Sequence, residues 1–184
     1  MLLSLISGLI LTVTGVLFAR YFLIWMKTPA EILDLATTYL KIYFLGMPAM
    51  MIYNFGSAIL RAIGDTKRPL YFLAAAGVIN IILNILLVVV FRLDVKGVGI
   101  ATVISQTVSA ILIIRCLAKS NGDIKLEFKK LRFSRGKIGA ILRIGLPAGL
   151  QGSIFSLSNV VIQSSVNIFG PVVVKGIAAA QNLE

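Results

Sequence analysis

The chain has 184 residues, of which 58% are hydrophobic and 14% charged, and its formal net charge is +11. Because so few polar residues cannot cover a water-soluble domain of this size, the composition excludes an ordinary soluble protein and predicts an integral membrane protein in a lipid bilayer. The basic residues lie in short stretches between apolar segments, which is typical of contact with anionic lipid headgroups, and we expect no nucleic acid partner.

Five apolar segments are long enough to cross a bilayer, which takes about 20 mainly apolar residues. They cover residues 1–24, 41–63, 71–92, 97–118 and 141–169, and a sixth begins at Pro171. The sequence therefore predicts an all-α fold, a polytopic bundle of transmembrane helices. The first segment lacks the basic start of a signal peptide and is longer than its apolar part, so we expect a spanning helix there.

The first connection contains both a stop signal and a start signal. The first helix is expected to end near Pro29, because proline restricts the residue before it. Glu31 and Asp34 suit the first turns of a helix, where the helix dipole favours acidic side chains. We expect a short exposed helix there, ahead of the second spanning segment.

The connection between the second and third segments has the signals of a tight turn. Gly64 can take the left-handed conformation that ends a helix. Asp65 or Thr66 can then cap the following helix. Pro69 falls in the first turn of that helix, where its missing N–H costs little.

Alternating crossings place most of the basic residues on one side of the membrane. Because basic residues prefer the cytoplasm, we expect the N-terminus and residues 119–137 to be cytoplasmic, in a multi-pass protein of the plasma membrane. The basic residues on this side are Arg61, Lys67, Arg68, Arg115, Lys119, Lys125, Lys129, Lys130, Arg132, Arg135, Lys137 and Arg143. The connection 119–137 either lies in the headgroup layer or is a solvated linker.

A polar stripe runs along the segment 141–169. Its members recur every three or four residues and so share one helix face: Gly152, Ser156, Asn159, Gln163 and Asn167. Polar side chains in hydrocarbon are costly unless they meet partners or water. The stripe therefore either forms hydrogen bonds with a neighbouring helix or lines a wet cavity.

Shorter stripes lie on the other segments. Gly77, Asn80 and Asn84 share a face of the third segment, and Met50 and Asn54 lie one turn apart on the second, where methionine is either core filler or the wall of an adaptable site. The fourth segment carries a seam of small residues, which favours close helix packing: Gly97, Ala101, Ser105 and Ser109. The candidates for a substrate cavity are Met50, Asn54, Asn80, Asn84, Ser156, Asn159, Gln163 and Asn167.

Two similar tetrapeptides, Gly46-Met47-Pro48-Ala49 and Gly145-Leu146-Pro147-Ala148, lie inside predicted helices. Proline there removes a backbone hydrogen bond and favours a kink, for which the glycine leaves room. Both tetrapeptides therefore permit the helix to bend.

The chemistry of an enzyme is missing from the sequence. The chain has no histidine, and no Asp or Glu lies within the predicted spanning segments. Metal-dependent hydrolysis or a proton relay at bilayer depth needs such groups. One cysteine, Cys116, cannot form a disulfide within the chain. We therefore expect neither an enzyme nor a bound metal or cofactor.

Four motifs carry a resemblance to a known family. The run Arg61-Ala62-Ile63-Gly64-Asp65-Thr66-Lys67-Arg68-Pro69 resembles the multidrug and toxic compound extrusion (MATE) family of antiporters. Three further motifs agree in order and spacing: Asn80-Ile81-Ile82-Leu83-Asn84, the run Gly97 to Gln106, and Gly145-Leu146-Pro147-Ala148-Gly149-Leu150-Gln151. The resemblance assigns structural roles to Gly46, Pro48, Arg61, Gly64, Asp65, Thr66, Pro69, Gly145 and Pro147.

The resemblance implies two lobes of about six helices each. Residues 1–118 are then four helices of the N-terminal lobe, from the third to the sixth, and 119–137 is the basic cytoplasmic linker. Residues 138–184 hold the first helix and the start of the second helix of the C-terminal lobe. The resemblance also implies that this chain packs against the helices of the full-length transporter that it lacks.

The function implied by the resemblance is cation-coupled export of small amphipathic organic compounds by alternating access, with H⁺ or Na⁺ as the coupling cation. One branch of the family has a glutamate partway along the seventh helix, where this chain has Ile154-Phe155-Ser156-Leu157 and no carboxylate. The chain is more similar to the branch whose coupling aspartate lies in the first helix. The alternative is a flippase for lipid-linked oligosaccharides or polysaccharides in the same superfamily.

Overall fold

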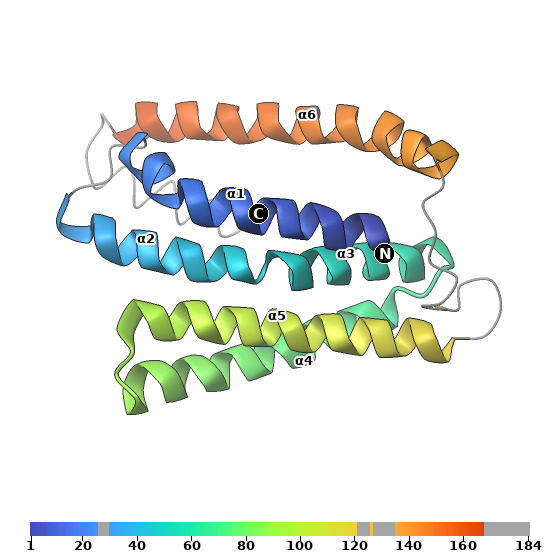
Figure 1. The fold of residues 1–184 in the computed structure, drawn as a ribbon, viewed down its shortest axis with the longest axis horizontal. Coiled ribbons are helices and arrows are strands. Elements are labelled where there is room, and N and C mark those ends of the chain that lie inside the picture. The colour runs from blue at the N-terminus through green and yellow to red at the C-terminus, as the bar shows by residue number, and fades with distance from the viewer. Residues whose placement is uncertain (26–29, 121–125, 127–134, 168–184) are drawn as a thin grey trace. The chain divides into compact units, whose positions relative to one another are not determined.

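The computed structural model describes residues 1–25, 30–120, 126 and 135–167, and the regular elements among them are all helices (Figure 1). The elements are α1 (Leu2–Trp25), α2 (Ala30–Leu45), α3 (Met47–Ala62), α4 (Lys67–Asn84), the π-helix η1 (Ile85–Val90), α5 (Asp94–Lys119) and α6 (Arg135–Asn167). This confirms the all-α fold class. The expected sixth helix from Pro171 and most of the linker 119–137 lie outside the described residues.

Contacts divide the chain into two compact units, Met1–Arg132 and Phe133–Glu184. Among the described residues, four helices are long and apolar enough to cross a membrane: Leu2–Trp25, Lys67–Val90, Asp94–Lys119 and Gly136–Asn159. The pair Glu31–Leu45 and Met47–Ala62, bent by 45° at its break, counts as a fifth. The predicted number of spans is therefore confirmed.

The prediction for the second span is wrong in one respect. A short helix starting near Glu31 was expected to be separate from a span over 41–63, but α2 runs unbroken from Ala30 to Leu45. No proline or glycine lies within α2, so a helix that begins at Glu31 has no reason to end before Gly46. Glu31 and Asp34 therefore belong to the bent span itself.

The break at Gly46 follows from the chemistry of Pro48. Proline has no N–H to donate to the carbonyl four residues earlier, that of Phe44. The Thr12 hydroxyl of α1 donates to that carbonyl instead, at 2.8 Å, while the Gly46 N–H donates to the Tyr43 carbonyl at 3.0 Å. A neighbouring helix thus satisfies the oxygen that the proline leaves without its usual partner.

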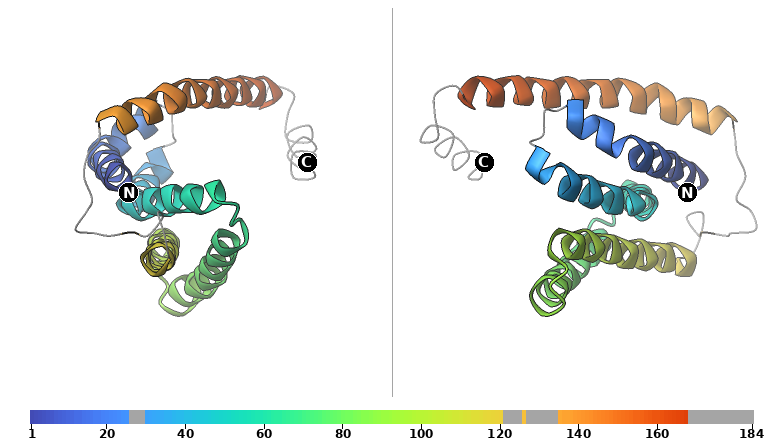
Figure 2. Two further views of the ribbon diagram at one scale, coloured as in Figure 1. Left: turned by 90° about the vertical axis from the view of Figure 1, so that its right-hand side faces the viewer. Right: turned by 60° about the vertical axis from the view of Figure 1, so that its left-hand side comes forward.

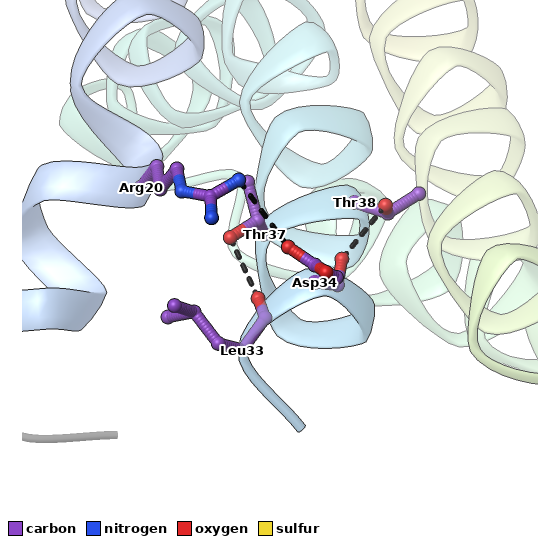
Figure 3. A network of polar contacts seen from close by, with 5 residues as sticks. All are labelled: Arg20, Leu33, Asp34, Thr37 and Thr38. Atoms are coloured by element: carbon purple, nitrogen blue, oxygen red, sulfur yellow. Dashed lines mark hydrogen bonds and ion pairs between the residues drawn. The ribbon is translucent and has the colours of Figure 1, made fainter. Parts of the chain in front are cut away.

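Helix α1 approaches the bent pair closely because its contact face carries small residues. A Cβ atom added to Gly8 would lie 2.6 Å from the Pro48 Cα, and one added to Gly15 would overlap the Phe44 ring. Small residues let helix backbones come together in this way. At the other end of α1, Arg20 pairs with Asp34 of α2 at 3.3 Å (Figure 3).

The four spans of the first unit pack in the order α1, the α2–α3 pair, α5, α4, as the views in Figures 1 and 2 show. A core of four buried side chains joins α3 to α5: Tyr53, Leu60, Ile113 and Leu117. The N-terminus, the end of α3, the start of α4 and the end of α5 share one end of this unit (Figure 1).

The turn between α3 and α4 has the expected geometry. Gly64 has φ +85°, in the left-handed region. The Asp65 carboxylate accepts a hydrogen bond from the Arg68 N–H at 3.2 Å, whereas Thr66, the residue before α4, makes no capping bond with its side chain. Asp65 is therefore the residue that caps α4. Pro69 lies in the first turn of α4, and its carbonyl accepts a hydrogen bond from the Tyr53 hydroxyl at 2.8 Å.

Candidate substrate cavity

A chain of hydrogen bonds connects the polar residues of α4 to α5. The Asn84 amide donates to the Asn80 side-chain oxygen at 2.9 Å, and the Asn80 amide donates to Ser105 Oγ at 3.2 Å. The Ser105 hydroxyl in turn donates to the Thr102 carbonyl at 2.9 Å. Asn80 lies near the middle of the span Lys67–Val90, so this network is at mid-depth of the helices.

A hollow of about 270 Å³ adjoins this network. Its walls come from α4 and α5: Leu73, Ala76, Gly77, Asn80, Thr102, Ser105, Gln106 and Ser109. A Cβ added to Gly77 would meet no atom within 4 Å, so the glycine leaves this wall open. The volume exceeds the roughly 30 Å³ that one water occupies in the liquid, so the hollow has room for several waters or part of an organic molecule.

Asn84 ends α4, and the π-helix η1 begins at the next residue. The Asn84 side-chain oxygen is buried and accepts no hydrogen bond from any part of the chain that the structure describes. A buried acceptor without a donor costs about 1–3 kcal/mol. Wide π turns are often found inside helices at functional sites. The end of α4 is therefore polar, but Asn84 is not among the residues that line the hollow and joins it only through Asn80.

The small-residue seam of α5 has two different roles. A Cβ on Gly97 would lie 3.1 Å from the Leu87 Cβ, which is the close packing that the seam predicts. Further along the helix, Ser105 and Ser109 are buried and line the hollow. The seam therefore packs against η1 at one end and forms a polar wall at the other.

The structure does not bring the second-segment candidates into the hollow. Met50 lines a separate void of about 10 Å³, at the limit of what holds one water. This volume favours the interpretation of Met50 as core filler. Asn54 is exposed on α3, away from both spaces.

The polar stripe of α6 belongs to the second unit. Ser156 and Asn159 are exposed there, and the side chains of Gln163 and Asn167 lie outside the described residues. The role of this stripe as a cavity wall stays a prediction. Helix α6 continues through Pro147 without a break.

Thr102 and Gln106 are cavity residues that the sequence reasoning missed. Both lie in the motif that carries the family resemblance, but neither was singled out as a cavity candidate. They are four residues apart and therefore share a helix face, and Gln106 borders both the hollow and the void beside Met50. Extending the search from Asn and Ser to every polar residue of α5 would have found them.

The site is polar but carries no formal charge. No carboxylate or basic group of the described residues lines the hollow, and the same residues contain no cluster of three or more His, Cys, Asp or Glu side chains. Amide and hydroxyl groups beside Leu73 and Ala76 can orient a ligand by hydrogen bonds while its apolar part contacts the wall. Such a surface suits an amphipathic molecule.

Comparisons with known proteins agree on one family. The MatE family profile matches residues 1–86. The chain is 36% identical to the probable multidrug resistance protein YpnP of Bacillus subtilis, over 92% of this chain and 38% of that protein. It is 26% identical to the multidrug export protein MepA of Staphylococcus haemolyticus, over 91% of this chain and 37% of that protein.

Solved structures give the same result. A MATE protein crystallised in a bent conformation is 27% identical, with a TM-score of 0.87 over 98% of this chain and 41% of its own. A multidrug resistance MATE transporter in an inward-facing conformation is also 27% identical, with a TM-score of 0.72 over 79% of this chain and 33% of its own.

The apolar spans and the polar hollow at mid-depth together define a multi-pass bundle of membrane-spanning helices. The chain belongs to the MATE family, as the profile, the relatives and the solved structures together show. It spans under two fifths of the length of the two relatives named above.

Proposed function

We propose that the protein exports small amphipathic organic compounds and that the hollow between α4 and α5 holds part of the substrate. The observation that carries this proposal is the set of amide and hydroxyl groups placed at mid-depth in otherwise apolar helices. Transporters of this kind bind substrates near the bilayer midplane. The names of the relatives, which describe multidrug resistance and multidrug export, support the same substrate class.

Export is coupled to the entry of a cation, H⁺ or Na⁺, and proceeds by alternating access. The solved relatives carry the descriptions inward-facing and bent, which supports a fold that takes more than one conformation. Because no carboxylate lines the hollow, we place the coupling site elsewhere in the protein. None of the relatives reported above supports the flippase alternative.

The test is an efflux assay on the protein as its gene encodes it, in cells without their own drug pumps. Asn80→Leu removes the hydrogen bond to Ser105 and turns a polar wall apolar, so we expect a changed order of preference among cationic dyes. Val78→Leu is the matched control, because Val78 is 57% exposed and lies outside the hollow.

The amount of folded protein is measured on the same cells. An unchanged substrate profile with less folded protein would reduce Asn80 to a packing role and overturn the proposed site. Two ionophores are tested separately, one that collapses the H⁺ gradient and one that collapses the Na⁺ gradient. We expect one of the two to stop efflux. Efflux that survives both ionophores would refute cation coupling.

The orientation is part of the proposal. We propose that the N-terminus and residues 119–137 face the cytoplasm of the plasma membrane, because the basic end of the bundle is expected inside. In intact cells, an impermeant thiol reagent should label a cysteine placed at Asp94 and should fail to label one placed at Gly122. The reverse pattern would invert the orientation.

A further inference from the structure

The two ends of the first unit differ in charge. At the end that holds the α3–α4 turn, the described residues of this unit include five basic residues and one acidic residue, Asp65; the basic ones are Arg61, Lys67, Arg68, Arg115 and Lys119. In the opposite half, the charged residues that the structure describes nearly balance: Arg20, Lys41, Arg92 and Lys96 with Glu31, Asp34 and Asp94. The first end therefore attracts anions more strongly than the other.

A second hollow, of about 450 Å³, opens at the basic end between the first turns of α4 and the last turns of α5. Arg68, Arg115 and Lys119 contribute its cationic groups, and Phe72 and Leu112 contribute apolar walls. The hollow thus combines a positively charged part with an apolar part, at a place where spanning helices end. It is separate from the cavity beside Asn80.

The cationic groups are held in an arrangement that favours an added anion. Arg115 and Lys119 are four residues apart on one face of α5, where like charges repel by about 0.2–0.5 kcal/mol. Both side chains are exposed, and neither forms an ion pair within the described ranges, where the pairs are Arg20–Asp34 and Arg68–Asp65.

Arg68 is positioned by its neighbours. Its Nε pairs with the Asp65 carboxylate at 3.1 Å, and its Nη1 lies 3.8 Å from Cys116 Sγ. These contacts leave the other terminal nitrogen of the guanidinium available for a ligand. The three cationic groups can therefore surround one phosphate.

We propose that this hollow binds the headgroup of an anionic phospholipid. The phosphodiester lies among Arg68, Arg115 and Lys119, and an acyl chain contacts Phe72 and Leu112. Basic pockets between transmembrane helices recognise anionic lipids by this combination of charge and depth. The apolar wall favours a lipid over a soluble phosphate, which gains nothing from Phe72 and Leu112. Lipid binding in this hollow does not depend on which compounds the protein exports.

The experiment measures lipid retention by native mass spectrometry on the protein as its gene encodes it, released from bilayer discs of phosphatidylglycerol and phosphatidylcholine. We expect preferential retention of phosphatidylglycerol. A double variant that combines Arg115→Gln and Lys119→Gln should weaken phosphatidylglycerol binding about fivefold for each lost charge. Arg92→Gln with Lys96→Gln removes the same charge at the opposite end and is the matched control, with retention unchanged.

Two further variants keep the result interpretable. Arg115→Lys with Lys119→Arg preserves both charges, so its retention of phosphatidylglycerol should stay within about twofold of the parent. Leu112→Gln should weaken phosphatidylglycerol binding and leave the binding of glycerol phosphate unchanged. Equal losses in the double glutamine variant and its control, or unchanged retention in both, would overturn the proposal. Full displacement of the lipid by equimolar glycerol phosphate would also overturn it, in favour of a soluble phosphate.

Discussion

The two Gly-x-Pro-Ala tetrapeptides have different effects on their helices. At Gly46-Met47-Pro48-Ala49 the helix breaks and the two halves are bent by 45°. At Gly145-Leu146-Pro147-Ala148 the helix α6 continues through the proline. A Cβ on Gly46 would lie 3.2 Å from the Val103 side chain, whereas one on Gly145 would meet no atom within 4 Å.

The difference shows that a proline alone does not break a helix, and at Gly46 contacts from α1 accompany the break. Near Gly46, Thr12 of α1 donates to the Phe44 carbonyl that Pro48 leaves free, and Gly8 lets the α1 backbone reach Pro48. Each of the following predictions changes one element of this comparison.

The largest effect is expected from Gly8→Val. The added Cβ would lie 2.6 Å from the Pro48 Cα, and backbone cannot move aside as a side chain can. We expect a loss of stability above the roughly 1–3 kcal/mol typical of overpacked cores. Thermal unfolding in detergent measures it. Gly149→Val is the control, because a Cβ there meets no atom within 4 Å. Equal losses in both variants would contradict the described contact.

The two proline variants should differ in their effect on stability. Pro147→Ala restores a hydrogen bond inside a continuous helix and should raise stability by up to about 3 kcal/mol. Pro48→Ala lies in the first turn of α3, where the missing N–H costs little, so we expect no gain. The same unfolding assay compares them. A gain at Pro48 equal to that at Pro147 would show that the missing N–H of Pro48 costs as much as one in the middle of a helix.

The smallest effect concerns a buried hydroxyl. Ser57 is 1% exposed, and its oxygen has no hydrogen-bond partner among the residues described. Ser57→Ala should therefore stabilise the protein by about 1 kcal/mol. Ser153→Ala in α6 removes an exposed hydroxyl bonded to the Gly149 carbonyl at 2.9 Å and should change stability by less than about 0.5 kcal/mol. Destabilisation by Ser57→Ala would reveal a partner for this hydroxyl.

Much of the fold could be predicted because lipid imposes a simple rule on the sequence. The five spans follow from apolar length, and the turn at Gly64 follows from a residue that tolerates positive φ. The start of the second span was mistaken because the charges of Glu31 and Asp34 indicate an exposed helix. Their charge does not show that the same helix continues to Gly46.

The candidate site was harder to predict because periodicity gives the face of one helix and not its neighbour. Asn80 and Ser105 are 25 residues apart, and only the packing of α4 on α5 brings them together. The same reasoning made Asn54 a cavity candidate; the structure leaves its side chain exposed and outside both spaces, and its role stays a prediction. Gln106 was missed because the sequence of α5 alone does not show that this side chain borders both the hollow and the void beside Met50.

The π-helix η1 has a consequence for how the sequence tolerates change in length. A π turn holds one residue more than an α turn of similar rise, so it is the structural form of a single inserted residue. Losing one residue from Ile85–Val90 can convert the wide turn to an α turn without rotating α4 or α5 about their axes. A deletion in the middle of α5 would instead turn every later side chain by about 100° to a new face. Natural variation in the length of this span is therefore expected to concentrate at η1.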